Sequence, residues 1–450
     1  MISTLEELRI EPLDGFLMAA NPRVGALSIL EEEELLVLAA FLLRPERGGL
    51  VEFFQKMSVA PEEAMARGDR LFERFQEDGW LRSAPPCEDG ESLNAVYFTV
   101  TRECNLACPY CYAGLEDRTG TWMPVEKASK ILDMVREVNP RCTIAITGGE
   151  PLTHPQFFEI LGETRKKGFE IALLTNGTLL DGTVASRLAG YDNLKHVQVS
   201  LDGITEASHS MTRGKNMESV LDSIRHLASC NIPFSIAPTL HEQNLHEAPD
   251  LASFAVRNGG YFTPNHLIVL PGRAHHGLTL SNDALSGAIA RIGLQLLDEF
   301  GEDGFDKMTP PFLKHLGGQA PYSSQGVCGV ARNIVDINWN GEVYPCNILK
   351  RDELILGNLF IEGFEAIFRR AEALKIRTRA CRIPQCSQCI FVAACAGGCR
   401  AGSYIASGAF DQPDCFCSCR YRMQKHALLL NHYRKRRDLE NCRRALRLLL

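Results

Sequence analysis

The 450-residue sequence predicts an α/β protein: a partial (β/α)6 barrel, with a small hairpin-and-helix unit before it and a cysteine-rich region after it. Between residue 93 and about residue 300, short apolar segments alternate with amphipathic segments of helical periodicity. This alternation is typical of parallel strands joined by crossover helices, and six such pairs are fewer than the eight of a complete barrel. From residue 310 the alternation stops, and eight of the 17 cysteines fall between Cys381 and Cys419.

These changes divide the chain into five predicted segments. They are a first unit at residues 1–82, a linker at 83–92, the barrel region at 93–309, the cysteine-rich region at 310–420 and a basic helix at 421–450. The strands expected in the barrel region are Ala95–Val100, Thr143–Thr147, Glu170–Thr175, His196–Ser200, Phe234–Thr239 and Leu267–Leu270. The helices expected between them are Val125–Glu137, Gln156–Lys167, Ala185–Ala189, Met217–Ser229 and Ala248–Asn258.

The first unit combines a hairpin with three helices. Two short apolar runs, Gly15–Ala20 and Ala26–Leu30, are separated by a turn-rich segment that contains proline and glycine, a pattern that predicts a hairpin. The helices expected after it are Leu35–Leu43, Leu50–Met57 and Pro61–Asp78. This arrangement resembles a small winged-helix fold.

Composition and charge argue against several classes of protein for this chain. Hydrophobic residues make up 45% of the chain, charged residues 23%, and the net charge is −7, so a broad nucleic-acid surface is not expected. No run of about 20 apolar residues predicts a membrane span, and no secretory signal is recognised. We therefore expect a cytoplasmic protein, in which clustered cysteines indicate metal ligands rather than disulfides. The basic run Arg434–Arg437 is interpreted as a solvated helix face, with a membrane or nucleic-acid surface as the alternative.

Three cysteines follow the first expected strand at once, in the spacing Cys104-x3-Cys108-x2-Cys111. Three thiolates on one loop can bind three irons of a [4Fe–4S] cluster and leave the fourth iron open. A structural zinc site would need a fourth ligand, and no further cysteine or histidine lies nearby. In βα barrels, chemistry is carried by the loops that follow the strands. The spacing therefore predicts a catalytic iron–sulfur cluster.

The CxxxCxxC motif, with the aromatic residue Tyr110 before its third cysteine, resembles the signature of the radical S-adenosylmethionine superfamily. The resemblance implies that the open iron binds S-adenosylmethionine and that its cleavage gives a 5′-deoxyadenosyl radical, which removes a hydrogen atom from the substrate. Further positions match the family's cofactor-binding motifs after successive strands. They are Gly148, Gly149 and Glu150 after the second, Asn176 after the third, Ser200 and Asp202 after the fourth, and Arg213 beyond them, with Tyr110 expected against the adenine.

The cysteine-rich region resembles the seven-cysteine extension called the SPASM domain. The resemblance implies two auxiliary iron–sulfur clusters. One would take Cys328, Cys346 and Cys399, and the other Cys386, Cys389, Cys395 and Cys417. Cys415 and Cys419 flank the last of these, so either could replace it. Because residues 317–327 contain no cysteine, the first auxiliary cluster could have an open iron, a non-cysteine ligand or a distant thiol such as Cys381. Zinc is the alternative for CxxC pairs.

The first unit also resembles the recognition domain of ribosomal-peptide maturation enzymes, the fold of the pyrroloquinoline-quinone peptide chaperone. That resemblance implies that a leader peptide adds a strand to the hairpin edge and packs on the third helix. The alternatives are a bridging or dimerising domain. The expected partners are a precursor peptide with leader and core, and an electron donor such as a flavodoxin or ferredoxin.

These features favour a peptide maturase that forms a thioether or a carbon–carbon cross-link. One alternative is a formylglycine-generating, sulfatase-type maturase, whose relatives place aspartate after the Tyr-Pro-Cys motif. Here Asn347 stands at that position, and an amide is no general base. A haem-precursor decarboxylase is a second alternative, although such an enzyme needs no leader-binding domain. A non-catalytic peptide carrier is a third, and the intact cofactor motifs oppose it.

Overall fold

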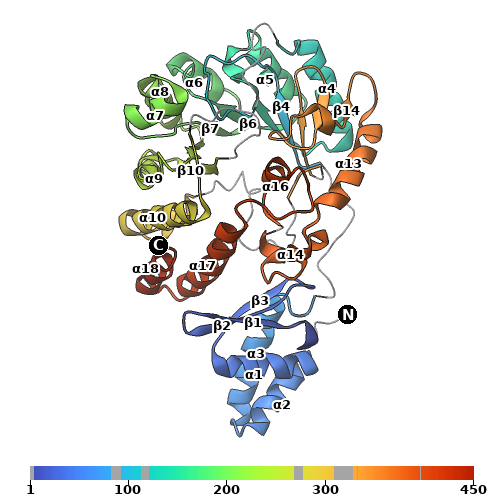
Figure 1. The fold of residues 1–450 in the computed structure, drawn as a ribbon, viewed down its shortest axis with the longest axis vertical. Helices are drawn as coiled ribbons and strands as arrows, with labels where there is room; N and C mark the ends of the chain where they lie inside the picture. Colours follow the sequence, from blue (N-terminus) through green and yellow to red (C-terminus); the bar gives the residue numbers. More distant parts are fainter. Residues whose placement is uncertain are drawn as a thin grey trace.

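The computed structural model describes residues 5–82, 93–112, 121–267, 277–308, 328–331, 333–395 and 397–450. The expected linker at 83–92 and the cysteine-free stretch at 317–327 lie outside these residues. Figure 1 shows an α/β body with a smaller unit of strands and helices at one end. No helix in the described part of the chain is long and apolar enough to cross a bilayer.

The N-terminal unit is a three-stranded antiparallel sheet followed by three helices (Figure 1). The strands are β1 (Arg9–Leu13), β2 (Phe16–Asn21) and β3 (Ala26–Leu30), and the helices are α1 (Glu32–Leu43), α2 (Arg47–Lys56) and α3 (Pro61–Glu77). The hairpin of β2 and β3 and the three helices lie where the sequence predicts them, whereas β1 is an additional strand that pairs with β2. Its residues are mostly exposed and include Pro12, so it lacks the apolar alternation by which strands are recognised.

Six parallel strands form the centre of the molecule. In spatial order they are β4 (Ala95–Thr99), β5 (Thr143–Thr147), β6 (Glu170–Thr175), β7 (Leu194–Val199), β8 (Phe234–Ile236) and β10 (Tyr261–Phe262). The helices of this region are α4 (Val125–Val138), α5 (Phe157–Lys166), α6 (Gly182–Ala189), α7 (Glu206–Arg213), α8 (Met217–Ser229) and α9 (Ala248–Arg257). Their apolar faces and the buried strands form one large core. The expected βα alternation is confirmed for β4 to β8.

The position of the sixth parallel strand was predicted wrongly. The sequence predicts it at Leu267–Leu270, but the strand that pairs with β8 is β10, a two-residue strand after the turn at Gly259 and Gly260. A strand of two residues has too few positions to show periodicity. Asn265–His266 form β11, which pairs with β9 (Thr239–Leu240) in a separate two-stranded ladder. Residues 268–270 are outside the described residues.

The cysteine-rich region continues the central sheet. Strand β12 (Ile334–Ile337) pairs in parallel with β4, and β13 (Glu342–Tyr344) and β14 (Gly357–Asn358) follow in antiparallel order to give nine strands in all. The helices of this region and of the segment before it are α10 (Asn282–Phe300), α11 (Glu302–Asp306), α13 (Phe364–Thr378), α14 (Pro384–Ser387), α15 (Val392–Cys395) and α16 (Arg400–Ser407).

The C-terminal segment is not one helix, as the sequence predicts, but two. Helix α17 runs over Cys417–Lys435 and α18 over Leu439–Arg447. Arg437 between them has a φ of 55°, and the Asp438 side chain accepts a hydrogen bond from the Asn441 N–H to begin α18. The reversal of the chain therefore coincides with the basic run, in which Arg436 and Arg437 are exposed.

The N-terminal sheet packs on the C-terminal helices (Figure 1). Leu13, Met18 and Ile29 share a buried apolar cluster with residues of α17 and α18, and with Ile390 and Phe391 of the cysteine-rich region. Polar contacts border this cluster: Glu11 accepts a hydrogen bond from Tyr421, and Asp14 pairs with Arg444 at 2.7 Å. The N-terminal unit is thus in direct contact with the part of the chain that carries the predicted auxiliary ligands.

Candidate active site

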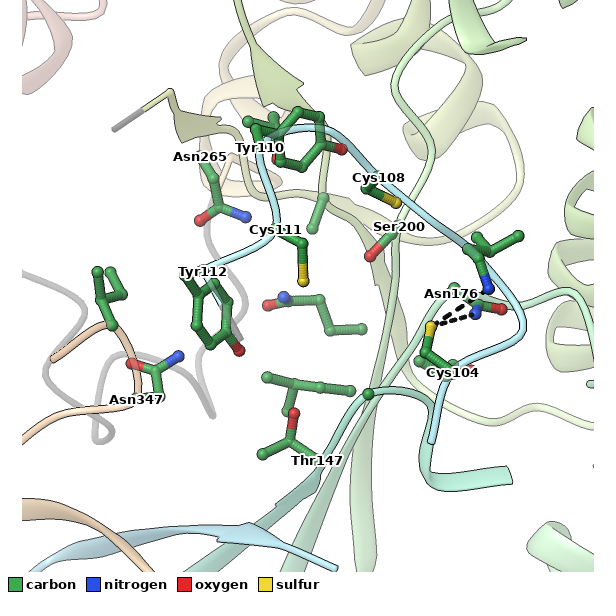
Figure 2. Close-up of a pocket in the computed structure, with 18 of the residues that line it drawn as sticks. Cys104, Cys108, Tyr110, Cys111, Tyr112, Thr147, Asn176, Ser200, Asn265 and Asn347 are labelled. Atoms are coloured by element: carbon green, nitrogen blue, oxygen red, sulfur yellow. Dashed lines mark hydrogen bonds between the residues drawn. The ribbon is translucent and has the colours of Figure 1, made fainter. Parts of the chain in front are cut away.

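A cavity of about 370 Å³ lies at the ends of the parallel strands where the chain leaves for the connecting loops. Figure 2 shows Cys104, Cys108 and Cys111 on the loop after β4, at the border of this cavity. Loops after β5, β6 and β7 supply further lining residues. The structure therefore brings the three cysteines of the CxxxCxxC motif together with most of the predicted cofactor-binding residues.

The backbone after β5 holds the cysteine loop in place. The N–H of Gly149 donates to the carbonyl of Thr101 at 2.9 Å, and the N–H of Glu150 donates to that of Glu103 at 2.7 Å. A Cβ atom on Gly148 or Gly149 would collide with these carbonyl oxygens. Both glycines also line the cavity. Their lack of a side chain is required by the packing of this loop, in addition to the close approach to a cofactor that the sequence suggests.

The Glu150 side chain does not line the cavity. It is fully buried, and its carboxylate accepts hydrogen bonds from the Thr175 hydroxyl at 2.8 Å and from the N–H groups of Asn176 and Leu152. Burial raises the pKa of Glu150 to about 7, and these donors oppose the shift. The structure thus places this carboxyl behind the cavity wall, where it connects the loops after β5 and β6.

Asp202 is also buried behind the wall, whereas Arg213 and Tyr110 reach the cavity. Asp202 pairs with the Arg213 guanidinium at 2.9 Å, and accepts hydrogen bonds from the hydroxyls of Tyr110 and Thr212. Burial raises the pKa of Asp202, but the Arg213 charge and these donors outweigh it, so the pKa is lowered. The guanidinium carbon of Arg213 lies 5.7 Å from the centre of the Tyr110 ring. Asp202 therefore fixes the positions of both side chains.

Asn176 and Ser200 line the cavity as expected (Figure 2). The Asn176 side-chain nitrogen lies 2.9 Å from Asn105 Oδ1 and 3.9 Å from Cys104 Sγ. Burial raises the pKa of the Cys108 thiol to about 11. A thiol in this environment remains protonated until a metal ion replaces the proton.

Several cavity residues escaped the sequence analysis. Gln198 within β7, Tyr97 within β4 and His266 within β11 all line the cavity. Gln198 is a polar residue at an interior strand position, and that feature could have marked it. Asn347, which follows Cys346, also lines the cavity beside Tyr112 (Figure 2).

The first predicted auxiliary set is brought together by the β12–β13 hairpin and α16. The N–H of Ala331 donates to the carbonyl of Pro345, which places the segments of Cys328 and Cys346 side by side. Cys399 caps α16, where its Sγ accepts the N–H of Gly402 at 3.3 Å. Burial raises the pKa of Cys346, and the charges of Cys399 and Cys328 raise it further. Cys399 also lines the cavity, so one residue of this set borders the same space as Cys104, Cys108 and Cys111.

The second predicted set lies on α14, on α15, at the start of α17 and on the segment between α14 and α15. Cys386 is on α14, Cys395 ends α15 and Cys417 begins α17, and the N–H of Cys389 donates to the carbonyl of Cys386. Burial raises the pKa of Cys386, and the charges of the other three thiols of the set raise it further.

The alternative ligands differ in their surroundings. Cys419 is fully buried in the main apolar core, with its Sγ 3.5 Å from Met423 Sδ. Cys415 is exposed, and its Sγ is 3.4 Å from Asp414 Oδ1. The side chain of Cys381 lies outside the described residues.

All fifteen cysteines that the structure describes are free thiols. In the same part of the chain, no three His, Cys, Asp or Glu residues are arranged around one metal ion; the ligands of an iron–sulfur cluster bind different irons and need not converge on one point.

Comparison with known proteins agrees with this geometry. The radical SAM superfamily model matches residues 98–255, and the model of the SPASM iron-sulfur cluster-binding domain matches residues 328–390. This chain is a radical S-adenosylmethionine enzyme. A [4Fe–4S] cluster, S-adenosylmethionine and auxiliary iron–sulfur clusters are the cofactors of a radical SAM enzyme of this kind.

Two relatives and one solved structure show the range of similar enzymes. The AdoMet-dependent heme synthase of Nitratidesulfovibrio vulgaris is 28% identical over 74% of this chain and 95% of its own length. The mycofactocin maturase MftC of Mycolicibacterium smegmatis is 26% identical over 77% of this chain and 86% of its own length. Streptococcus suis SuiB bound to its precursor peptide SuiA has a similar fold, with a TM-score of 0.57, 14% identity, and coverage of 93% of this chain and all of that chain.

The residues of this radical SAM enzyme suit the catalytic cluster and its cofactor. Three thiols of one loop border a single cavity, and the glycines after β5 let the backbone approach it closely. Arg213 provides a cation at the cavity wall, suited to the carboxylate of S-adenosylmethionine. When bound, the cluster supplies the electron that cleaves S-adenosylmethionine.

Proposed function

We propose that this radical SAM enzyme modifies a ribosomally made precursor peptide by forming a cross-link. A thioether between a cysteine sulfur and a carbon atom is the first candidate, and a carbon–carbon bond is the second. Cys104, Cys108 and Cys111 would bind the catalytic cluster, and Tyr110, Gly148, Gly149, Asn176, Ser200 and Arg213 would surround the cofactor. Glu150 and Asp202 would act from behind the wall by holding these residues.

The observation that carries the proposal is that Cys399 lines the same cavity as the catalytic cysteines. Removal of a hydrogen atom from a substrate carbon leaves a carbon radical. When that carbon bonds to a cysteine sulfur, the S–H bond breaks, and one proton and one electron leave. An iron–sulfur cluster held by Cys328, Cys346 and Cys399 would lie beside this step as the electron acceptor. A small flavodoxin or ferredoxin would supply the electron that starts the reaction.

The N-terminal unit supports a peptide substrate. The likeness to SuiB leaves only 7% of this chain unmatched, so most of residues 1–82 are inside the match. That structure is described as bound to a precursor peptide. We propose the same kind of partner for this chain, with the leader pairing to an edge of the N-terminal sheet.

The two edges of that sheet differ. Strand β1 contains Pro12, which has no N–H to donate to an added strand. Strand β3 offers the N–H of Leu27 and the carbonyl of Ile29, which contact the Asp78 carbonyl and the Arg74 guanidinium at the end of α3. We propose that the leader pairs with β3 beside α3, and that it replaces these two contacts.

A haem-precursor decarboxylase remains the second candidate, because the heme synthase of N. vulgaris is as similar to this chain as the maturase is. The sulfatase-type reaction is less favoured. Asn347 lines the cavity at the position where relatives of that type carry aspartate, and its amide does not accept a proton.

The test is an anaerobic reaction of the reconstituted enzyme with S-adenosylmethionine and dithionite. Its substrates are short peptides encoded beside the enzyme's own gene, each with and without its leader. We expect a peptide product that has lost two hydrogen atoms per cross-link, formed with one 5′-deoxyadenosine and only when the leader is attached. A thioether product should also lose one titratable thiol per cross-link.

Other products would identify the alternatives. A haem precursor added in place of the peptide should give no decarboxylated product if the proposal holds. Conversion of a peptide cysteine to an aldehyde would indicate the formylglycine reaction. Either result, with no cross-linked peptide, would contradict the proposed function.

A further inference from the structure

Asp414 and Arg420 form an ion pair with a buried carboxylate at the start of α17. The Asp414 side chain is 1% exposed, and the Arg420 side chain is 24% exposed. The Arg420 Nε–H donates to Asp414 Oδ2, which also accepts the backbone N–H of Cys399 at 2.9 Å. The other carboxylate oxygen accepts the backbone N–H of Phe416 at 3.2 Å. The carboxylate is therefore held from several directions.

This pair lies between the two predicted auxiliary sets. Cys399, whose N–H the carboxylate accepts, belongs to the set with Cys328 and Cys346. Cys395 and Cys417 belong to the other set, and Cys417 lies one helical turn before Arg420 on α17. The short segment between Cys395 and Cys399 thus connects both sets, and Asp414 is bonded to its end.

The backbone of that segment is shaped for the contact. Gly398 has a φ of 75°, and a Cβ atom at this position would collide with the Asp414 side chain. Any other residue would be strained in its backbone and would push the carboxylate away. Close approach of this charge to the cysteine segment is therefore built into the fold.

The two charges have opposite signs, and each lies close to a predicted ligand. The Asp414 carboxylate accepts the backbone N–H of Cys399, a member of one set, and Arg420 lies one helical turn after Cys417, a member of the other set. One ion pair is thus within electrostatic reach of both places where an auxiliary cluster would be bound.

We propose that the Asp414–Arg420 pair tunes the reduction potentials of both auxiliary clusters, with Arg420 raising and Asp414 lowering them. Reduction adds a negative charge to a cluster, so a nearby cation favours the reduced form and a nearby anion disfavours it. Neither residue is a predicted ligand, so both would act on the clusters by their charge and not by binding iron. The inference depends on the auxiliary clusters being bound by these cysteines, and not on the identity of the substrate.

The test uses the full chain with Cys104, Cys108 and Cys111 replaced by alanine, so that only auxiliary clusters remain. Arg420→Met, Arg420→Lys and Asp414→Asn are compared in this background after anaerobic reconstitution. Iron and sulfide content is measured first, and a redox titration followed by electron paramagnetic resonance then gives the potentials. We expect Arg420→Met to lower the potentials, Asp414→Asn to raise them, and Arg420→Lys to leave them close to those of the parent.

Arg422→Gln is the matched control. Arg422 lies two residues further along α17, and pairs at the surface with Asp283; its loss should not change the potentials. A purely structural role for the pair would disturb the clusters in the same direction in both charge-removing variants. Shifts of the same sign, or no shift in either variant, would overturn the proposal. If Arg420→Met lost its auxiliary iron, Asp414→Asn would decide alone, and an unchanged or lowered potential there would overturn it.

Discussion

At the scale of single residues, the cysteine loop and its supports have separate tasks. The three thiols face the cavity, Gly148 and Gly149 line it and let the loops pack closely, and Glu150 holds the loops from behind. Substitution of a thiol should therefore abolish cofactor cleavage without unfolding the barrel region. Substitution of a supporting residue should change the free energy of unfolding as well.

Simultaneous replacement of Cys104, Cys108 and Cys111 by alanine should abolish 5′-deoxyadenosine formation and leave the auxiliary iron bound. The reason is that these thiols lie on one loop and are members of neither predicted auxiliary set. Chromatographic assay of 5′-deoxyadenosine and iron analysis check the two parts. Cys230→Ala, which changes a half-buried thiol outside every predicted set, is the control and should retain activity. Undiminished cofactor cleavage in the triple variant would disprove the assignment.

Glu150 should make the stability of the cofactor-free protein depend on pH. Burial raises its pKa from 4.5 to about 7, so the folded state retains a proton that the unfolded chain releases. This contribution is fully present below pH 4.5, and is lost as pH rises to about 7, by up to about 3 kcal/mol. Glu150→Gln cannot ionise, so its unfolding free energy should increase relative to the parent across this range. Urea unfolding at several pH values measures it, and a pH-independent difference would contradict the assignment.

At the scale of elements, the accuracy of sequence-based prediction followed segment length. Strands β4 to β7 have five or six residues with apolar runs, and all four were expected within two residues of their observed bounds. Strands β1 and β10 were missed, since one contains Pro12 and charged residues and the other has two residues. The grouping of Cys104, Cys108 and Cys111 at one cavity could be predicted because their spacing along one loop carries the information. His266 could not, because it reaches the cavity through the pairing of two-residue strands, β9 and β11, that show no periodicity.

The N-terminal sheet should bind a leader at one edge only. Hydrogen–deuterium exchange of the enzyme with and without the leader peptide tests this directly. Exchange should slow in Ala26–Leu30, because the leader would pair with the N–H groups on that edge. Exchange in Arg9–Leu13 should not change, and this segment is the internal control. Slowing confined to β1, or absent from both strands, would contradict the proposed binding edge.

Strand β12 is tied to β4 by a buried ion pair as well as by backbone pairing. Asp336 is fully buried, and lies 3.0 Å from Lys350 Nζ, which also donates to the Thr99 hydroxyl. Lys350→Met would leave Asp336 buried without a cation, and should destabilise the fold by about 3 kcal/mol near neutral pH. Lys130→Met, at an exposed position of α4, should change stability by less than about 0.5 kcal/mol. Urea unfolding midpoints compare the two, and equal effects would contradict a special role for the pair.

At the scale of the whole molecule, the domains predicted from sequence are less separate than their boundaries suggest. The N-terminal sheet shares an apolar cluster with α17, α18 and the segment after Cys389. Removal of residues 1–82 would therefore uncover apolar surface beside the second auxiliary set. The N-terminal unit, which is proposed to bind the leader, therefore shares one buried interface with the surroundings of the second auxiliary set.

The iron content of the reconstituted chain should report on the whole set of ligands. One catalytic and two auxiliary [4Fe–4S] clusters require about twelve irons per chain, and a [2Fe–2S] cluster at the three-cysteine set would give about ten. Mössbauer spectroscopy distinguishes these cases. About four irons together with bound zinc would contradict iron–sulfur auxiliary sites and support zinc in the cysteine-rich region.

The pairing of β12 with β4 also has a consequence for how the chain folds as it is synthesised. Thr99 of β4 and Asp336 of β12 are 237 residues apart in sequence, yet their side chains are in contact. At about 5–20 residues per second, a ribosome needs roughly 10–50 s to make the intervening chain. During that interval the outer edge of the first parallel strand has no partner strand, and unpaired edges promote association between chains. We therefore expect slow translation or truncation before residue 334 to leave the nascent protein prone to aggregation.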